Sequence, residues 1–147
     1  YLYASLDTDA LRDNLKHAED PDGLVRKAIP ALLRTMALTN PSGKQNSFAG
    51  HVLPSAMLVD CKTDKIPVSL VNAFVKPAVA DPSGDLVQSS IESLVKQSDE
   101  IDQAFGLPVE KKLWFCMDRY SKIVPPSGAV VCKNFAELVE QAGQSLK

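Results

Sequence analysis

The 147-residue sequence predicts a single α+β domain of the ferredoxin-like or RNA-recognition-motif type, with an antiparallel sheet that carries helices on one face. Strand patterns are separated by segments with helical periodicity, and two of the strand patterns follow one another as a hairpin. The expected order is therefore β-α-α-β-β-α-β-α. A hydrophobic content of 45% and a charged content of 23% are ordinary for a globular protein of this size.

The N-terminal segment predicts a strand followed by a short helix. Residues 1–6 alternate aromatic or apolar residues with small ones, which favours a strand. Either Asp7 or Thr8 is a suitable N-cap for a helix over residues 9–17, because a short side-chain oxygen there accepts bonds from free backbone amides.

The next segments predict a long helix and a hairpin. Residues 23–38 carry an apolar stripe at helical spacing, and Pro30 lies within it. Proline removes a backbone donor and clashes with the preceding turn, so we expect a kink or two abutting helices. Residues 52–60 and 68–75 are strand-like and are joined by a polar turn, which predicts the hairpin.

The C-terminal half predicts a helix, a strand and a closing helix. Residues 86–105 have an apolar helical face, and Gly106 is well placed as the residue that ends this helix. Residues 112–118 are strand-like. Asn134 is a good N-cap for a final helix over residues 135–146.

Composition and charge restrict the possible partners. The net charge of −2 does not indicate a polyanion-coating surface, so any nucleic-acid contact needs a local basic patch. The apolar runs are far shorter than the roughly 18 residues that suggest a membrane span, so we expect no membrane partner. Cys61, Cys116 and Cys132 form no CxxC pair, which favours a reduced, cytoplasmic protein. The chain starts inside a strand pattern at Tyr1, and we therefore expect a fragment or a processed chain.

Catalytic signatures are scarce, and we predict a protein that is not an enzyme and has no cofactor or metal. His17 and His51 are far apart in sequence, and no P-loop, GxGxxG, GxSxG or HxxxH pattern exists. Trp114 and Phe115 are adjacent in a strand and so point to opposite faces. One of them is expected in the core, while the other is either buried against a helix or available to stack on a base.

The stretch NPSGKQNSFAG, residues 40–50, is the strongest candidate for a binding site. It lies between a predicted helix and a predicted strand, and it is rich in glycine and small polar residues. Backbone amides near glycine, a lysine charge and amide side chains together suit a phosphate and the adjoining sugar. The candidate RNA-binding residues are Ser42, Gly43, Lys44, Gln45, Asn46 and Phe48. Composition alone leaves an ordinary surface loop as the alternative.

Three motifs resemble one family. PSGKQNSFA resembles the GxKQxxxA loop of the Cascade backbone subunit, the guide-RNA-binding CasC-type family of type I-E CRISPR effector complexes. YLYASLDTDALRDNL resembles the aromatic strand and following helix of that family, and residues 67–79 resemble its "ANAFEKAV" segment. The resemblance covers most of residues 1–96 and then thins out.

The resemblance implies a modified RNA-recognition-motif fold and a non-catalytic function in antiviral defence. Such subunits oligomerise along the guide RNA (crRNA), and the guide pairs with target DNA. The implied partners are the guide RNA, target DNA through the guide, copies of the chain itself and other Cascade subunits. The match is to the C-terminal portion of such a subunit, so residues 1–147 are expected to form one domain that lacks the upstream palm and thumb.

The resemblance implies roles for the residues of the 40–50 segment. Lys44 would contact a phosphate, while Gln45 and Asn46 would donate to sugar or phosphate or shape the loop. Ser42 and Gly43 would allow close backbone approach. Phe48 fits either stacking or anchoring. The alternative function is a ferredoxin-like assembly module whose 40–50 segment contacts a neighbouring subunit and not RNA.

Overall fold

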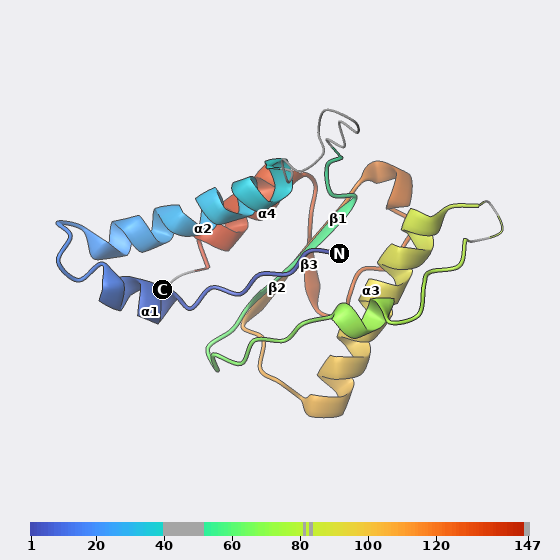
Figure 1. Ribbon diagram of the computed structural model, residues 1–147, viewed down its shortest axis with the longest axis horizontal. Helices are drawn as coiled ribbons and strands as arrows, with labels where there is room; N and C mark the ends of the chain where they lie inside the picture. The colour runs from blue at the N-terminus through green and yellow to red at the C-terminus, as the bar shows by residue number, and fades with distance from the viewer. Residues whose placement is uncertain (40–51, 81, 83, 146–147) are drawn as a thin grey trace.

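The α+β class is confirmed by a computed structural model, which describes residues 1–39, 52–80, 82 and 84–145 (Figure 1). These described residues form three strands, four α-helices and two short 3₁₀ helices. In chain order they are α1 (Thr8–Asn14), α2 (Pro21–Leu38), β1 (Ala56–Cys61), η1 (Val71–Phe74), α3 (Leu86–Phe105), β2 (Lys111–Cys116), η2 (Asp118–Tyr120), β3 (Ala129–Cys132) and α4 (Phe135–Gly143).

The sheet has the order β1-β2-β3 and is mixed. β1 pairs with β2 in antiparallel fashion and sets Leu58 opposite Trp114, while β2 and β3 are parallel and set Leu113 beside Val130. The expected sheet was antiparallel throughout. The difference arises from β3, whose apolar run AVVC is only four residues long and was not predicted as a strand.

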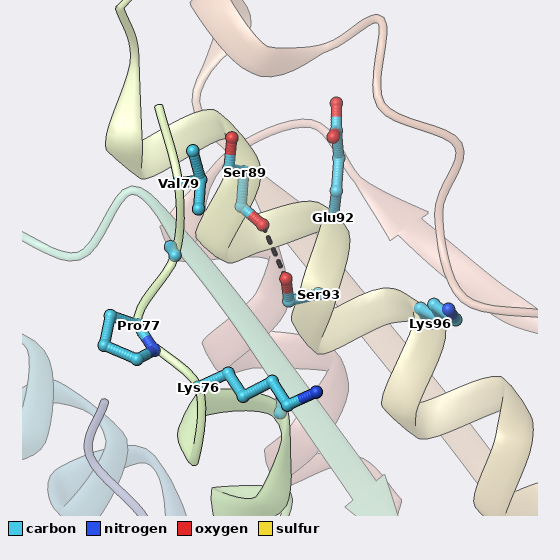
Figure 2. Close-up of a pocket in the computed structure, with 9 residues that line it drawn as sticks. Lys76, Pro77, Val79, Ser89, Glu92, Ser93 and Lys96 are labelled. Atoms are coloured by element: carbon cyan, nitrogen blue, oxygen red, sulfur yellow. Dashed lines mark hydrogen bonds between the residues drawn. The ribbon is translucent and has the colours of Figure 1, made fainter. Parts of the chain in front are cut away.

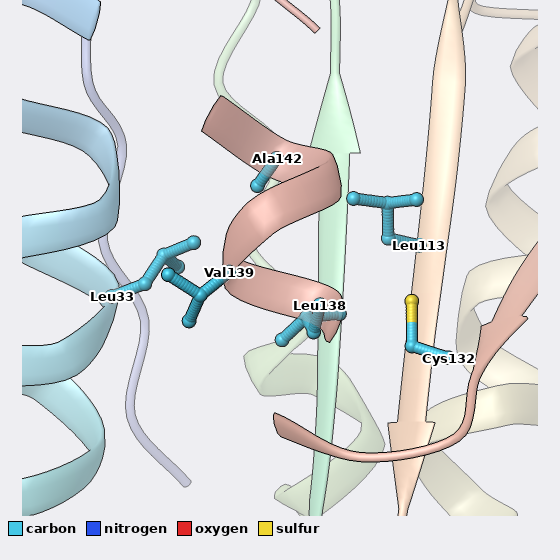
Figure 3. Packing of buried hydrophobic residues seen from close by; sticks show 6 residues of the cluster. All are labelled: Leu33, Leu113, Cys132, Leu138, Val139 and Ala142. Atoms are coloured by element: carbon cyan, nitrogen blue, oxygen red, sulfur yellow. The ribbon is translucent and has the colours of Figure 1, made fainter. Parts of the chain in front are cut away.

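Helices cover both faces of the sheet, whereas the sequence predicted one covered face. Leu113 and Trp114 are neighbours on β2 and point to opposite faces, as successive strand residues must. Leu113 packs with residues of α2 and α4, including Leu33 and Leu138 (Figure 3). Trp114 packs on the other face against Ile91 and Val95 of α3. Figure 1 shows α2 and α4 on one side of the sheet and α3 on the other.

The helix ends follow local chemistry closely. The side chain of Asp7 accepts from the amides of Asp9 and Ala10, which confirms a cap at this position, and α1 is shorter than expected. Asn134 accepts from the amide of Glu137 and begins α4 as predicted. Gly106 ends α3 with φ 56°, a left-handed conformation that suits glycine.

α2 is one helix through Pro30 and not two. It starts two residues before the predicted start, with Asp20 as N-cap and Pro21 in the first turn, where a missing backbone donor is harmless. The ring of Pro30 lies against Gly143 of α4, where an added Cβ would sit 3.0 Å from Pro30 Cγ. The proline therefore lies in the contact between α2 and α4.

Two predicted strands are absent. Residues 1–7 form neither a helix nor a strand and have no ladder partner among the described residues. Residues 71–74 form η1 in place of the second hairpin strand, so the predicted hairpin is wrong. Side chains compete with a ladder in this segment, because Ser69 Oγ accepts from the amide of Val71 and Tyr1 Oη accepts from that of Leu70.

Candidate functional site

All the predicted RNA-binding residues lie in residues 40–50, outside the described part of the chain. Their assignment stays a prediction. These residues are Ser42, Gly43, Lys44, Gln45, Asn46 and Phe48. His51 also lies outside the described residues. The described flanks are Thr39, whose amide closes the last turn of α2 on Thr35, and the exposed Val52 and Leu53 before β1. The segment thus connects the α2 layer to an edge strand of the sheet.

The other two motif segments are in contact with each other. The ring of Tyr1 lies 4.9 Å from that of Phe74, centroid to centroid, with an interplanar angle of 33°. The hydroxyl of Tyr1 accepts a 2.8 Å bond from the amide of Leu70 and lies 3.5 Å from Ser69 Oγ. The start of the chain therefore holds the segment that leads into η1.

η1 and the residues after it face α3 across an open groove of about 400 Å³ (Figure 2). One wall runs from Ala73 to Val79. The other wall is one face of α3. Its lining residues follow the first of them by three, four and seven positions, which is the spacing of one helical face. The α3 wall consists of Ser89, Glu92, Ser93 and Lys96.

Two lysines and one carboxylate line this groove. Lys76 is exposed and makes no ion pair with a described residue, while Lys96 makes only a loose 3.8 Å pair with the exposed Glu100. Glu92 accepts a 3.1 Å bond from Gln88 Nε2. The lining therefore has an excess of positive charge in a chain whose net charge is −2.

Several other cations are held by carboxylates. Lys65 Nζ lies 2.9 Å from Asp9 Oδ2, and this hydrogen bond and charge hold the pKa of Asp9 below its usual range. Arg12 Nε bonds Asp22 Oδ1 at 2.6 Å. These pairs fasten α1 to the start of α2 and to the turn after β1. Their charges are therefore partly compensated within the fold.

Lys112 on β2 is buried with its partners. Its ammonium group donates to Ser98 Oγ at 3.0 Å and to Asp102, both on α3. Only 4% of the Lys112 side chain is exposed. This charge fastens α3 to the sheet and is not available to a ligand.

The adjacent aromatic residues Trp114 and Phe115 both pack against helices, one on each face of β2. Trp114 is buried under α3, and the Phe115 ring is 6.4 Å from that of Phe135 on the α4 side. Both faces of β2 are thus covered at these positions. The buried Trp114 is therefore not available to stack on a base, whereas Phe115 is only partly buried and stacking by this ring stays a prediction.

The described residues include the three thiols and other residue types that can ligate a metal. No group of three or more His, Cys, Asp and Glu that could hold a metal is found there. Cys61, Cys116 and Cys132 are free, and burial raises the pKa of each thiol. Raised pKa values reduce the thiolate fraction and therefore the nucleophilicity of these groups. Within the described ranges, no helix combines the length and apolar character of a membrane span.

Sequence reasoning missed the groove between η1 and α3. The available signals were the helical spacing of the serines and Lys96 on α3 and the lysine inside the third family-like motif, Lys76. Their proximity could not be predicted because residues 68–75 were expected to form a strand of the sheet.

Comparisons with known proteins agree on one group. A family model described as CT1975-like protein matches residues 1–141. A chain of a solved structure described as a CRISPR RNA-guided surveillance complex has a TM-score of 0.77 and 19% identity, over 95% of this chain and 50% of that one. A second, described as a CRISPR RNA-guided surveillance complex, pre-nicking, has a TM-score of 0.75 and 17% identity, over 95% and 35%. No curated protein matches the chain.

Proposed function

Because the chain belongs to the CT1975-like protein family, we propose that it is a non-catalytic, guide-RNA-binding component of a CRISPR surveillance complex. The observation that carries the proposal is the shared fold with a chain of an RNA-guided surveillance complex, at a TM-score of 0.77 over 95% of this chain. The present chain spans half of that chain and about a third of the second, so the activity of the whole assembly is itself part of the proposal.

In this proposal the 40–50 segment contacts the guide backbone. Lys44 supplies a point charge to a phosphate, and Gln45 and Asn46 donate to sugar or phosphate oxygens. Ser42 and Gly43 allow the backbone to approach closely. Phe48 either stacks on a base or anchors the segment. Sequence discrimination is left to pairing between the guide and target DNA.

The near-neutral charge of the chain fits repeated binding along one strand. Several copies, together with other subunits of the complex, would each add a few phosphate contacts, and linkage along the guide multiplies weak affinities. A protein of this kind does not need a strongly basic surface on each copy. We place this assembly in the cytoplasm, as the three reduced cysteines suggest.

The test is the salt dependence of RNA binding by the assembled complex carrying Lys44→Ala. Loss of one phosphate contact on a single strand should lower the slope of log K against log salt by about 0.7. Lys133→Ala is the matched control, because Lys133 is an exposed lysine before α4 with no ion pair to a described residue. An unchanged slope for Lys44→Ala, with intact assembly, would rule out the phosphate role.

One observation favours the alternative of a protein contact at the same segment. Leu38, Val52 and Leu53, which flank it, are all exposed by half or more of their surface. Clustered exposed apolar residues are typical of protein interfaces. In that case Lys44→Ala would weaken association between subunits while the RNA affinity of each subunit stayed the same.

A further inference from the structure

We propose that the groove between η1 and α3 is a second nucleic-acid contact, which binds a backbone phosphodiester between Lys76 and Lys96. The inference deepens the proposed function and depends on it, but it concerns other residues than the 40–50 segment. The guide RNA and a DNA strand present the same phosphodiester chemistry, and the experiment below separates these two sources.

The groove has the size and access that a strand needs. Its volume of about 400 Å³ lies in the range of small-ligand sites, and it is open to solvent, so a polymer can reach it from outside. Ser89 and Ser93 project little into the groove, because their short side chains donate hydrogen bonds to backbone carbonyl groups of the preceding turn. A phosphate can therefore approach the helix surface closely.

The charges in the groove favour an anion. Lys76 and Lys96 come from opposite walls and both line the groove, so both charges attract an anion that enters it (Figure 2). Lys96 can leave Glu100 readily, since exposed ion pairs of this kind contribute little. The Glu92 side chain extends away from Lys76 in Figure 2 and accepts from Gln88, which limits its repulsion of a bound phosphate.

The lining also indicates which part of the strand is bound. It contains no aromatic side chain, so it offers no platform on which a base could stack. Pro77, Ala78 and Val79 offer apolar surface of the kind that contacts sugars. The groove would therefore hold backbone and leave the bases free to pair, without a preference for sequence.

The wall that carries Lys76 is anchored before any ligand binds. Phe74 lies two residues before Lys76 and packs against the Tyr1 ring, while Leu70 donates to the Tyr1 hydroxyl. A wall fixed in this way loses less conformational entropy on binding. The same contact joins two of the family-like motifs to the groove.

The experiment measures nucleic-acid binding by the full-length protein in its assembled complex, with Lys76→Ala, Lys96→Ala and the double variant. In one arm the probe is the guide RNA, and in the other a guide-loaded complex binds a complementary DNA strand. The double variant should lower the salt slope of one arm by about 1.4, and each single variant by about 0.7. Lys122→Ala, an exposed lysine outside the groove, should leave both slopes unchanged. Lys76→Arg should retain the slope because it retains the charge.

A lower slope in the RNA arm assigns the groove to the guide, and a lower slope only in the DNA arm assigns it to DNA. Both results support the proposal. Unchanged slopes in both arms overturn it, as does a loss of subunit association with unchanged slopes, which would assign the groove to protein. If Lys44→Ala lowers the RNA slope while the groove variants change neither the RNA slope nor the DNA slope, the inference fails and the proposed function stands. Lys76→Gln and Lys96→Gln, checked by thermal unfolding, serve if an alanine variant is unstable.

Discussion

The hydroxyl of Tyr1 accepts a hydrogen bond of 2.8 Å from the backbone amide of Leu70, across almost half the length of the chain. The bond occupies a backbone donor that a strand would have used in a ladder. It also places the Tyr1 ring on Phe74 of η1, so the N-terminal segment and the wall of the groove form one unit.

Tyr1→Phe should remove this bond and keep the ring contact. We expect a loss of about 1 kcal/mol in the free energy of unfolding. Amide hydrogen exchange at Leu70 should become faster, because its donor is freed, while exchange within α3 stays the same. Tyr1→Leu, which removes the ring as well, serves as the comparison and should be less stable still. Unchanged exchange at Leu70 would show that the bond does not persist in solution.

The buried charge on β2 predicts an asymmetric response to mutation. Asp102→Ala leaves the ammonium of Lys112 with Ser98 as its remaining hydrogen-bond partner, and should lower the free energy of unfolding by about 2 kcal/mol. The double variant Lys112→Met/Asp102→Leu removes both charges together and should change stability by less than about 1 kcal/mol. Urea unfolding of the two variants measures the difference. Equal losses would mean that the ion pair itself stabilises the fold.

The Asp9 carboxyl should titrate below its usual range. The hydrogen bond and charge of Lys65 lower its pKa in the folded state, so the contribution of this pair to stability is present above the unfolded pKa of about 3.9 and is lost as pH falls through the folded pKa. Lys65→Gln should move the pKa of Asp9 upward in an NMR titration. Lys62→Gln removes a neighbouring charge and is the control. If the Asp9 pKa is the same with and without Lys65, the pair is not formed in solution.

A cavity formed in the core between α4 and the sheet should lower the free energy of unfolding strongly. Leu138 is fully buried between α4 and the sheet, so Leu138→Ala should destabilise the protein by about 3 kcal/mol. Val131→Ala removes apolar atoms from a β3 side chain that is 57% exposed, and should change stability by about 0.5 kcal/mol or less. Thermal or urea unfolding compares the two. Similar losses at both positions would contradict the core described for α2, α4 and the sheet.

Helices were predictable from the sequence because their signals are local. The whole of α3 follows from its apolar periodicity and from Gly106, and α4 starts at its predicted cap, Asn134. The α+β class follows from the alternation of such segments with strand-like ones. In each case the residues that decide the structure are within a few positions of one another.

Strands were predicted less well because a strand forms only by pairing with another strand, and the local sequence does not show which distant segment that is. Residues 1–6 and 68–75 have strand-like composition, but the contact of Tyr1 with Leu70 and Phe74 takes the place of a ladder. β3 is short, and its partner β2 lies beyond a loop and η2. The groove could not be predicted for the same reason, since Lys76 and Lys96 come to line one groove only when residues 71–74 form η1.

β2 supplies Leu113 to one core and Trp114 to the other, and it is the central strand of the sheet. During synthesis from the N-terminus, α2 emerges well before α4, on which it packs, and β1 emerges well before its partner strand β2. Leu33 of α2 meets its partners only when α4 has left the ribosome. The apolar faces of the early elements remain exposed throughout that interval, a state in which chaperones commonly bind nascent chains. Completion of the core under α2 thus awaits the synthesis of α4, whereas the buried residues of the core under α3 have all been made once Tyr120 is added.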